Sequence, residues 1–177
     1  NEKITLLEAA IKMKPSYIDA HFNLANAFSK LGLHTQAIIE YKKTISFNEN
    51  HFKALNNLAN EYLLKKNYLE AKECIYLSLN INSKYSLAHN NLGNILKAEG
   101  KIKEAVVAYR EALKLNGRYI DAINNLAASL FMLGIYDESL ELSMTSLKLT
   151  PWSIKSSVLL TQAKNAMNLK SNHPFYN

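Results

Sequence analysis

Asn57-Leu58-Ala59-Asn60 and Asn91-Leu92-Gly93-Asn94 are two copies of one short pattern. A further copy begins at Asn23, and a fourth, which ends in alanine, begins at Asn125, so that the same interval separates every copy from the next. A fixed period of about 34 residues is the signature of an array of helix–turn–helix repeats. The chain is therefore predicted to be an all-α solenoid, in which each repeat buries apolar surface against the next.

The period also sets the predicted boundaries along the chain. Residues 1–16 match the second helix of a truncated N-terminal repeat, so part of its apolar stripe is expected to be uncovered. Two explanations stay open for this helix: the chain was cut from a longer array, or the uncovered face stacks on another copy. Residues 154–168 predict a capping helix, and residues 169–177 a tail or a linker to a following domain. The four complete repeats are 18–51, 52–85, 86–119 and 120–153.

Within each repeat, the apolar residues follow the period of a helix. The first helix carries alanine at position three, leucine at position seven, a small residue at position eight and a bulky residue at position eleven, which makes one wide apolar face. Position fifteen predicts a C-terminal cap with left-handed backbone, and it is occupied by Gly32, Gly100 and Gly134. Lys66 replaces the glycine in the second repeat, so strain or a different cap is expected there.

These positions together resemble the tetratricopeptide repeat. The resemblance rests on the leucine and the small residue, the glycine, an alanine at position twenty, Tyr41 and Tyr109 at position 24, and Pro15 and Pro151 at position 32. It covers nearly the whole chain. The resemblance implies a right-handed superhelix of antiparallel helix pairs, whose first helices line the concave face.

Asparagines dominate the stripe of the first helices that lies opposite the packing face, at positions six and nine. An asparagine can donate to and accept from the backbone of an extended peptide, and a row of them resembles the asparagine ladder in the repeat array of O-linked N-acetylglucosamine transferases. Structural consensus within the family is the alternative explanation. The carboxylate clamp of chaperone-binding members is not expected, because Phe22, Leu87 and Asn91 occupy its positions. The predicted peptide-binding residues, here called the asparagine ladder, are Asn23, Asn26, Asn57, Asn60, Asn91, Asn94 and Asn125.

An apolar end to the groove is predicted where the ladder stops at Ala128. It could receive a hydrophobic side chain of a partner, the chain's own Phe175-Tyr176, or a downstream domain. The predicted residues of this end are Phe131, Met132, Val158 and Leu159.

Net charge, hydrophobic run length and cysteine content limit which classes of partner and which cellular compartment are expected. The formal charge is +6, but the basic residues are scattered and do not form a stripe interleaved with aromatics, so no nucleic acid is expected. No apolar run approaches the ~18 residues that cross a bilayer, so no membrane partner is expected. Cys74 has no second cysteine to pair with and is expected to be a buried or half-buried structural thiol. A cytoplasmic location is expected, because no signal-peptide pattern is seen.

The sequence therefore favours a non-catalytic scaffold that binds an extended protein segment. No metal site, catalytic set or phosphate loop is found by spacing, so no cofactor and no enzyme activity are predicted. His21 and His89 stand at position four of their first helices and are expected to face the core. Two alternatives remain: the substrate-recruiting arm of a larger enzyme such as a glycosyltransferase, and a homo-oligomer formed through the N-terminal helix.

Overall fold

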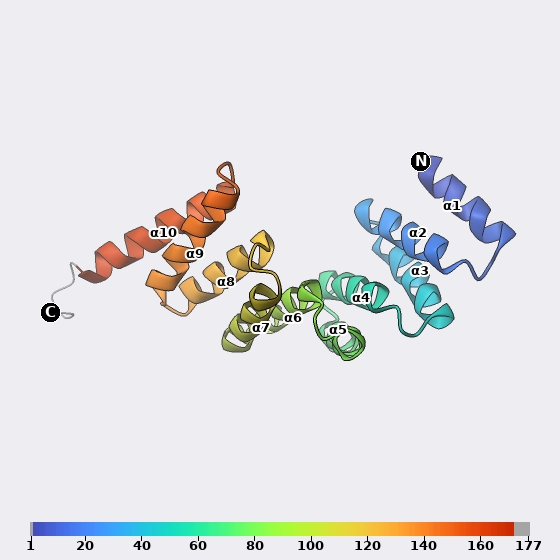
Figure 1. Cartoon of the computed structure of the whole chain (residues 1–177), viewed down its shortest axis with the longest axis horizontal. Coiled ribbons are helices and arrows are strands. Elements are labelled where there is room, and N and C mark those ends of the chain that lie inside the picture. Colours follow the sequence, from blue (N-terminus) through green and yellow to red (C-terminus); the bar gives the residue numbers. More distant parts are fainter. Residues whose placement is uncertain (1, 172–177) are drawn as a thin grey trace. The chain divides into compact units, whose positions relative to one another are not determined.

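The computed structural model of the chain describes the backbone of residues 2–171 and the side chains of residues 2–168. All regular elements in that part are α-helices (Figure 1). The helices are α1 Glu2–Met13, α2 Ile18–Lys30, α3 His34–Phe47, α4 Phe52–Leu64, α5 Tyr68–Ile81, α6 Ser86–Ala98, α7 Ile102–Leu115, α8 Ile120–Met132, α9 Tyr136–Leu149 and α10 Ile154–Ser171.

The helices keep the period of the sequence. The second helices of the repeats begin at His34, Tyr68, Ile102 and Tyr136, at the interval that separates the asparagine patterns. The first helices begin at the same interval, at Ile18, Phe52, Ser86, Ile120 and Ile154. The predicted all-α array of antiparallel helix pairs is therefore confirmed, and α10 extends a few residues beyond the predicted end of the cap.

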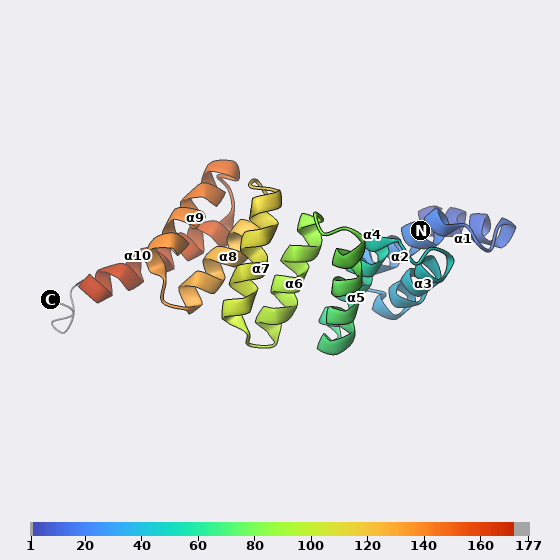
Figure 2. The ribbon, with the colours of Figure 1, turned by 60° about the horizontal axis from the view of Figure 1, so that its bottom comes forward.

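The helices group into two compact units, residues 1–84 and residues 85–177. In the first unit, α2 pairs with α3 and α4 pairs with α5, while α3 packs on α4 and α1 packs on α2. In the second unit, α6 pairs with α7 and α8 pairs with α9, and α10 closes on α9 (Figure 2). Helix α8 also contacts α6 and α10 directly, so the first helices of this unit lie next to one another.

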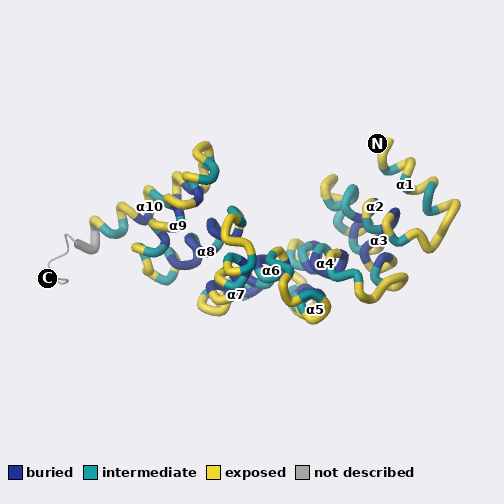
Figure 3. Tube along the Cα trace, viewed as in Figure 1, coloured by how far each residue is buried: buried dark blue, intermediate teal, exposed yellow. Residues whose placement is uncertain are grey.

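Small residues let the paired helices approach closely. The alanines at positions three and twenty of the repeats are completely or almost completely buried, and dark blue segments in Figure 3 mark such inward faces. At Gly93 a Cβ would overlap the ring of Tyr109, lying 2.6 Å from Cδ1. The small residue at position eight therefore sets the distance between α6 and α7. Around this contact the second unit builds its core from Leu96, Ala105, Val106, Ala108, Tyr109, Leu126 and Leu130.

The turns inside the repeats share one C-terminal cap. In the second repeat, the Lys66 amide donates to Leu63 O at 2.9 Å and the Asn67 amide donates to Tyr62 O at 2.9 Å. This pair of bonds requires left-handed backbone between them. Lys66 adopts it with a φ of 61°, so the second repeat keeps the same cap instead of a different one and places a side chain where left-handed backbone disfavours it. The other three repeats use glycine, with φ of 73° at Gly32, 80° at Gly100 and 76° at Gly134.

Helix α1 is the least buried helix of the first unit, as its yellow and teal tube in Figure 3 shows. None of its residues is buried, and Leu6 and Met13 are 64% and 89% exposed. The apolar stripe is thus partly uncovered, as expected from the sequence.

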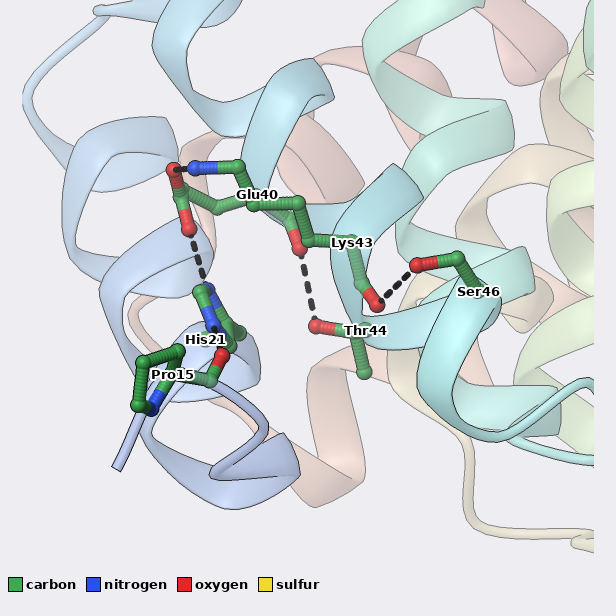
Figure 4. A network of polar contacts seen from close by, with 6 residues as sticks. All are labelled: Pro15, His21, Glu40, Lys43, Thr44 and Ser46. Atoms are coloured by element: carbon green, nitrogen blue, oxygen red, sulfur yellow. Dashed lines mark hydrogen bonds and ion pairs between the residues drawn. The ribbon is translucent and has the colours of Figure 1, made fainter. Parts of the chain in front are cut away.

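A buried polar network ties the turn before α2 to α3 (Figure 4). The His21 ring is buried, and its Nε2 donates to Pro15 O at 2.8 Å. Its Nδ1 lies 2.6 Å from Glu40 Oε2, and Lys43 Nζ donates to Glu40 Oε1 at 2.7 Å. Both ring nitrogens are therefore used within the protein, which confirms that His21 faces the core.

Candidate functional site

The asparagine ladder lies on the first helices of both units. Helices α2 and α4 carry Asn23, Asn26, Asn57 and Asn60, and helices α6 and α8 carry Asn91, Asn94 and Asn125. Asn23 is exposed and the other six are half-buried. We call the surface that they share within each unit its first-helix face.

In the first unit, a buried tyrosine and two ladder residues form one hydrogen-bonded set. Tyr41 Oη donates to Asn26 Oδ1 at 2.7 Å, and Asn57 Nδ2 donates to the same oxygen at 2.9 Å. Asn56 Nδ2 in turn donates to Asn57 Oδ1 at 3.0 Å. The tyrosine comes from the second helix of the repeat, so the set links α3, α2 and α4.

The second unit repeats this set two periods further along the chain. Tyr109 Oη donates to Asn94 Oδ1 at 2.9 Å, and Asn125 Nδ2 donates to Asn94 Oδ1 at 3.0 Å. The second proton of Asn125 Nδ2 goes to Asn90 Oδ1, also at 3.0 Å. We call these two sets, Tyr41–Asn26–Asn57 and Tyr109–Asn94–Asn125, the Tyr–Asn–Asn triads.

The triads fix which way the central amides point. Asn26 Oδ1 and Asn94 Oδ1 each accept two bonds, which fills both lone pairs of the oxygen. A flipped amide would set an N–H₂ group against a neighbouring N–H₂ group, so the network determines the orientation. The Nδ2 groups of Asn26 and Asn94 have no bonding partner among the described residues. Each central amide therefore keeps two N–H donors for another molecule.

Burial keeps the triad tyrosines protonated. The pKa of Tyr41 is raised to about 12, chiefly by desolvation and also by the nearby Glu61 carboxylate, against hydrogen bonds that lower it. Desolvation also raises the pKa of Tyr109. Both hydroxyls therefore remain donors at neutral pH, and the amide orientation is constant under those conditions.

The neighbouring asparagines at position five of the first helices are buried. Asn56, Asn90 and Asn124 are only 2%, 3% and 4% exposed. Asn124 Oδ1, for example, accepts from Ser156 Oγ at 3.0 Å in the second unit. Two of these buried amides bond directly to ladder residues, Asn56 to Asn57 and Asn90 to Asn125. Sequence reasoning missed the triads, although one signal was available. Of the four complete repeats, the first and third combine a tyrosine at position 24 with an asparagine at position nine.

The ladder is not uniform along the chain. Ile75 and Ser143 replace the triad tyrosine in the second and fourth repeats, so Asn60 has no equivalent hydroxyl to orient it. Ala128 replaces the asparagine itself in the fourth repeat. The predicted row of asparagines thus contains two oriented centres, one in each unit.

The predicted apolar end needs one correction. Met132 and Val158 are exposed, and Phe131 is half-buried with its ring 5.4 Å from that of Tyr136. Leu159, in contrast, is only 8% exposed. It stands at position six of α10, where the preceding first helices have a ladder asparagine, and it is buried there and does not line the groove. The predicted contact from Phe175-Tyr176 lies outside the described residues.

The reactive side chains of the described part have structural surroundings. Burial raises the pKa of the Cys74 thiol to about 11, and the neighbouring Glu73 carboxylate adds to the shift. Glu61 is buried and accepts from Ser29 Oγ at 2.5 Å, with His34 Nδ1 at 2.7 Å. Among the described residues, no three His, Cys, Asp or Glu side chains are grouped so that they could hold a metal ion. The same part contains no helix both long and apolar enough to cross a membrane.

Paired helices of constant length, stacked at a fixed period, define the class of helical repeat proteins. Family models identify the particular repeat. The tetratricopeptide repeat model matches residues 18–51 and 52–85, and a model described as TPR repeat matches residues 93–134. The chain belongs to the tetratricopeptide repeat family. A search of curated proteins gave no match.

Solved structures of low sequence identity share the fold. TTC0263, a TPR protein of Thermus thermophilus, has a TM-score of 0.78 and 22% identity over 92% of this chain and 89% of its own. YrrB, described as a TPR protein with an unusual peptide-binding site, has a TM-score of 0.68 and 20% identity over 94% of this chain and 93% of its own. The Cut9–Hcn1 hetero-tetramer of the APC/C has a TM-score of 0.80 and 18% identity over 98% of this chain and 37% of the matched chain.

Proposed function

We propose that the chain is a non-catalytic protein-interaction module that binds an extended protein segment on its first-helix faces. The observation that carries the proposal is the Tyr–Asn–Asn triad, present in both units. Each triad leaves the amide nitrogen of its central asparagine, Asn26 or Asn94, with two N–H donors. Because those donors are held in place before binding, less conformational entropy is lost when a ligand accepts from them.

The chemistry of the triads favours backbone recognition. An extended segment presents a carbonyl oxygen at every residue, and these oxygens accept from N–H donors whatever the side chains are. Asn23 and Asn60 offer further amides on the same face of the first unit. The proposed site therefore tolerates many sequences, and the other members of the asparagine ladder extend it along the helices.

Two further roles predicted from the sequence stay predictions. The first alternative is that the chain is the substrate-recruiting arm of a larger enzyme, whose substrate would bind to the same face. The sequence of the full-length gene product would show whether a catalytic domain is present. Self-association through α1 is supported by the exposure of Leu6 and Met13, and light scattering at increasing protein concentration tests it.

Asn26→Asp is the variant that tests the proposed donor. A carboxylate still accepts from Tyr41 Oη and Asn57 Nδ2, so the triad is kept, but it has no N–H to offer a peptide carbonyl. We expect the affinity for short extended peptides, measured by fluorescence anisotropy on the whole chain, to fall about 3-fold to 10-fold, as for one lost hydrogen bond.

Asn48→Asp is the matched control. Asn48 lies in the turn between α3 and α4, is exposed, and accepts from the Asn50 amide at 3.0 Å through an oxygen that aspartate also provides. The Asn48→Asp variant therefore adds the same negative charge as Asn26→Asp, but in a turn and not on the first-helix face. Equal affinities for Asn26→Asp and the unaltered chain would contradict the proposal, as would an equal loss in the control.

A further inference from the structure

Helix α1 keeps the register of the second helices that follow it. Counted back by one period from α3, its residues Lys3, Leu6, Leu7 and Ala10 stand at positions 20, 23, 24 and 27 of a repeat. In α3, α5 and α7, the residues at these four positions are at most 9% exposed. In α1, Lys3 and Leu6 are exposed, and Leu7 and Ala10 are half-buried. The uncovered face of α1 is therefore the face that the other second helices bury.

The complete repeats show what covers these positions. At position 20, Ser139 Oγ donates to Ala127 O at 2.8 Å. At position 24, the ring of Tyr109 fills the space beside Gly93. Both contacts join a second helix to the antiparallel first helix of its own repeat. The open face of α1 thus has the residue positions that a first helix covers elsewhere in the chain.

Asn23 borders the same open place from the side of α2. At position six of the later first helices, Asn57 Nδ2 donates to Asn26 Oδ1 and Asn125 Nδ2 donates to Asn94 Oδ1, each on the preceding first helix. Asn23 also stands at position six, but it is exposed and forms no hydrogen bond with the described residues. An open hollow of about 500 Å³ lies here, lined by Glu2, Lys3, Leu6, Leu7 and Asn23.

We propose that the open face of α1, together with Asn23, binds an amphipathic helix of a partner protein, which lies antiparallel to α1 in the place of a first helix. Leu7 corresponds to Ile75, and the second repeat combines Ile75 with Ala59 at position eight. A small residue opposite Leu7 is therefore expected on the partner helix, followed by a side-chain oxygen that accepts from Asn23 Nδ2. Lys3 is larger than the alanine or serine at position 20 elsewhere, but its flexible side chain can extend past the helix into solvent.

The first helices of a second copy do not fit this place. Helices α2, α4, α6 and α8 already pair with the second helices of their own repeats. Helix α10 has Thr161 at position eight and Lys164 at position eleven, where the other first helices have a small residue and a bulky apolar one. Both side chains are exposed, so this face of α10 is polar. A helix of another protein is the occupant that matches the apolar face of α1.

The experiment uses the whole chain and two labelled peptides. The first peptide has the sequence of residues 52–64, because this first helix carries the small residue that an aliphatic position 24 accepts. The second peptide has proline in place of Ala59, which prevents a continuous helix. Binding is measured by fluorescence anisotropy to the unaltered chain, to Leu6→Asp and to Leu69→Asp. Leu69 is the matched control, since it lies on α5 and is 66% exposed, against 64% for Leu6.

We expect the first peptide to bind the unaltered chain and Leu69→Asp equally. Its binding to Leu6→Asp should be about 10-fold weaker or more, because a carboxylate would be buried against the apolar face of the peptide. Side-chain amide NMR of the unaltered chain gives a second readout that needs no variant. The Nδ2 protons of Asn23 should shift when the first peptide binds, and an unchanged Asn23 amide would count against the proposed placement of the helix.

The other occupants give different results. Equal binding of the proline peptide would assign the surface to an extended segment. Self-association of the unaltered chain that Leu6→Asp removes, without binding of either peptide, would assign it to a second copy. Each of these results would overturn the inference, as would equal losses in Leu6→Asp and Leu69→Asp, or no binding at all. The proposed function would still stand, because it depends on the triads and is tested at Asn26.

Discussion

Lys66 has left-handed backbone, with a φ of 61°, at a position where the other complete repeats have glycine. A side chain in this conformation costs about 1–2 kcal/mol, and part of the gain from glycine is lost to the greater entropy of the unfolded chain. We therefore expect Lys66→Gly to raise the free energy of unfolding by about 0.5–1 kcal/mol in urea denaturation.

The neighbouring lysine provides the control for this prediction. Lys65 has a φ of −85°, which any residue adopts, so Lys65→Gly should not stabilise the chain. If the two variants change stability equally, the left-handed backbone at Lys66 stores no strain.

Gly93 is the second single residue on which the packing depends. A methyl group there would overlap the buried ring of Tyr109, which also orients Asn94 through its hydroxyl. We expect Gly93→Ala to lower the free energy of unfolding by about 1–2 kcal/mol, despite the better helix propensity of alanine, because the completely buried ring of Tyr109 would have to shift. In the first repeat, Ala25 and Tyr41 occupy the same two positions, so α2 and α3 accommodate a methyl group that α6 and α7 do not.

Gly117→Ala controls for the change of residue alone. The nearest atom to a Cβ at Gly117 is Leu113 O at 3.7 Å, an ordinary contact. The free energy of unfolding of Gly117→Ala should therefore change little.

Adding Tyr109→Ile to Gly93→Ala should recover part of the lost stability, because the second repeat combines Ala59 with Ile75 at these positions. An unchanged or increased stability of Gly93→Ala would show that the two helices separate easily.

Cys74 gives a test at the level of a single titrating group. The sequence predicts a buried or half-buried thiol; the thiol is buried, and its pKa is raised to about 11 from an ordinary value of 9.0, chiefly by desolvation. The thiolate is the reactive form, so at pH 8 its population is about 100-fold lower than in the unfolded chain, and alkylation by iodoacetamide should slow to a similar extent or more. The rate should rise as pH increases toward the raised pKa. Equal rates in native buffer and in urea would contradict the buried placement.

At the level of helices, the His21–Glu40 pair joins the turn before α2 to α3. His21→Leu leaves the Glu40 carboxylate buried with Lys43 as its remaining partner, and leaves Pro15 O without its donor. We expect a loss of about 2–4 kcal/mol in the free energy of unfolding. Later repeats place Leu55 with Cys74, and Ile123 with Leu142, at the same two positions.

The double variant His21→Leu with Glu40→Leu is the informative comparison. Replacing both partners by apolar side chains removes the uncompensated charge, so it should lose less stability than His21→Leu alone. Equal losses in the single and double variants, measured by urea denaturation, would mean that the ion pair is not what stabilises the junction.

Helix positions were predictable because each repeat contains its own cap residues and its own small packing residues. The glycines and Lys66 mark the C-terminal caps, and the alanines at positions three and twenty mark the faces that touch, so local rules and packing agree. The depth of burial was harder to predict. Leu159 was predicted to line the apolar end of the groove, but it is only 8% exposed. The asparagines at position five are also buried, because their amides bond to neighbouring first helices, as Asn124 does to Ser156.

For the molecule as a whole, the fixed period of the asparagine patterns was sufficient to predict the class of fold and the face that packing leaves uncovered. It could not show that the ladder side chains bond to one another, since those bonds join residues 31 positions apart on successive first helices. It also could not show that the amide oxygens of Asn26 and Asn94 are used internally while their amide nitrogens are left. These two central amides, one in each unit, therefore act as oriented donors.

Side-chain amide NMR of the whole chain tests this central claim most directly. On titration with a short extended peptide, the Nδ2 protons of Asn26 and Asn94 should shift as they donate to peptide carbonyls. Those of Asn125 should stay unchanged, because both are already bonded to Asn90 and Asn94. Peptide binding that perturbs other residues but leaves the Asn26 and Asn94 amides unchanged would contradict the account.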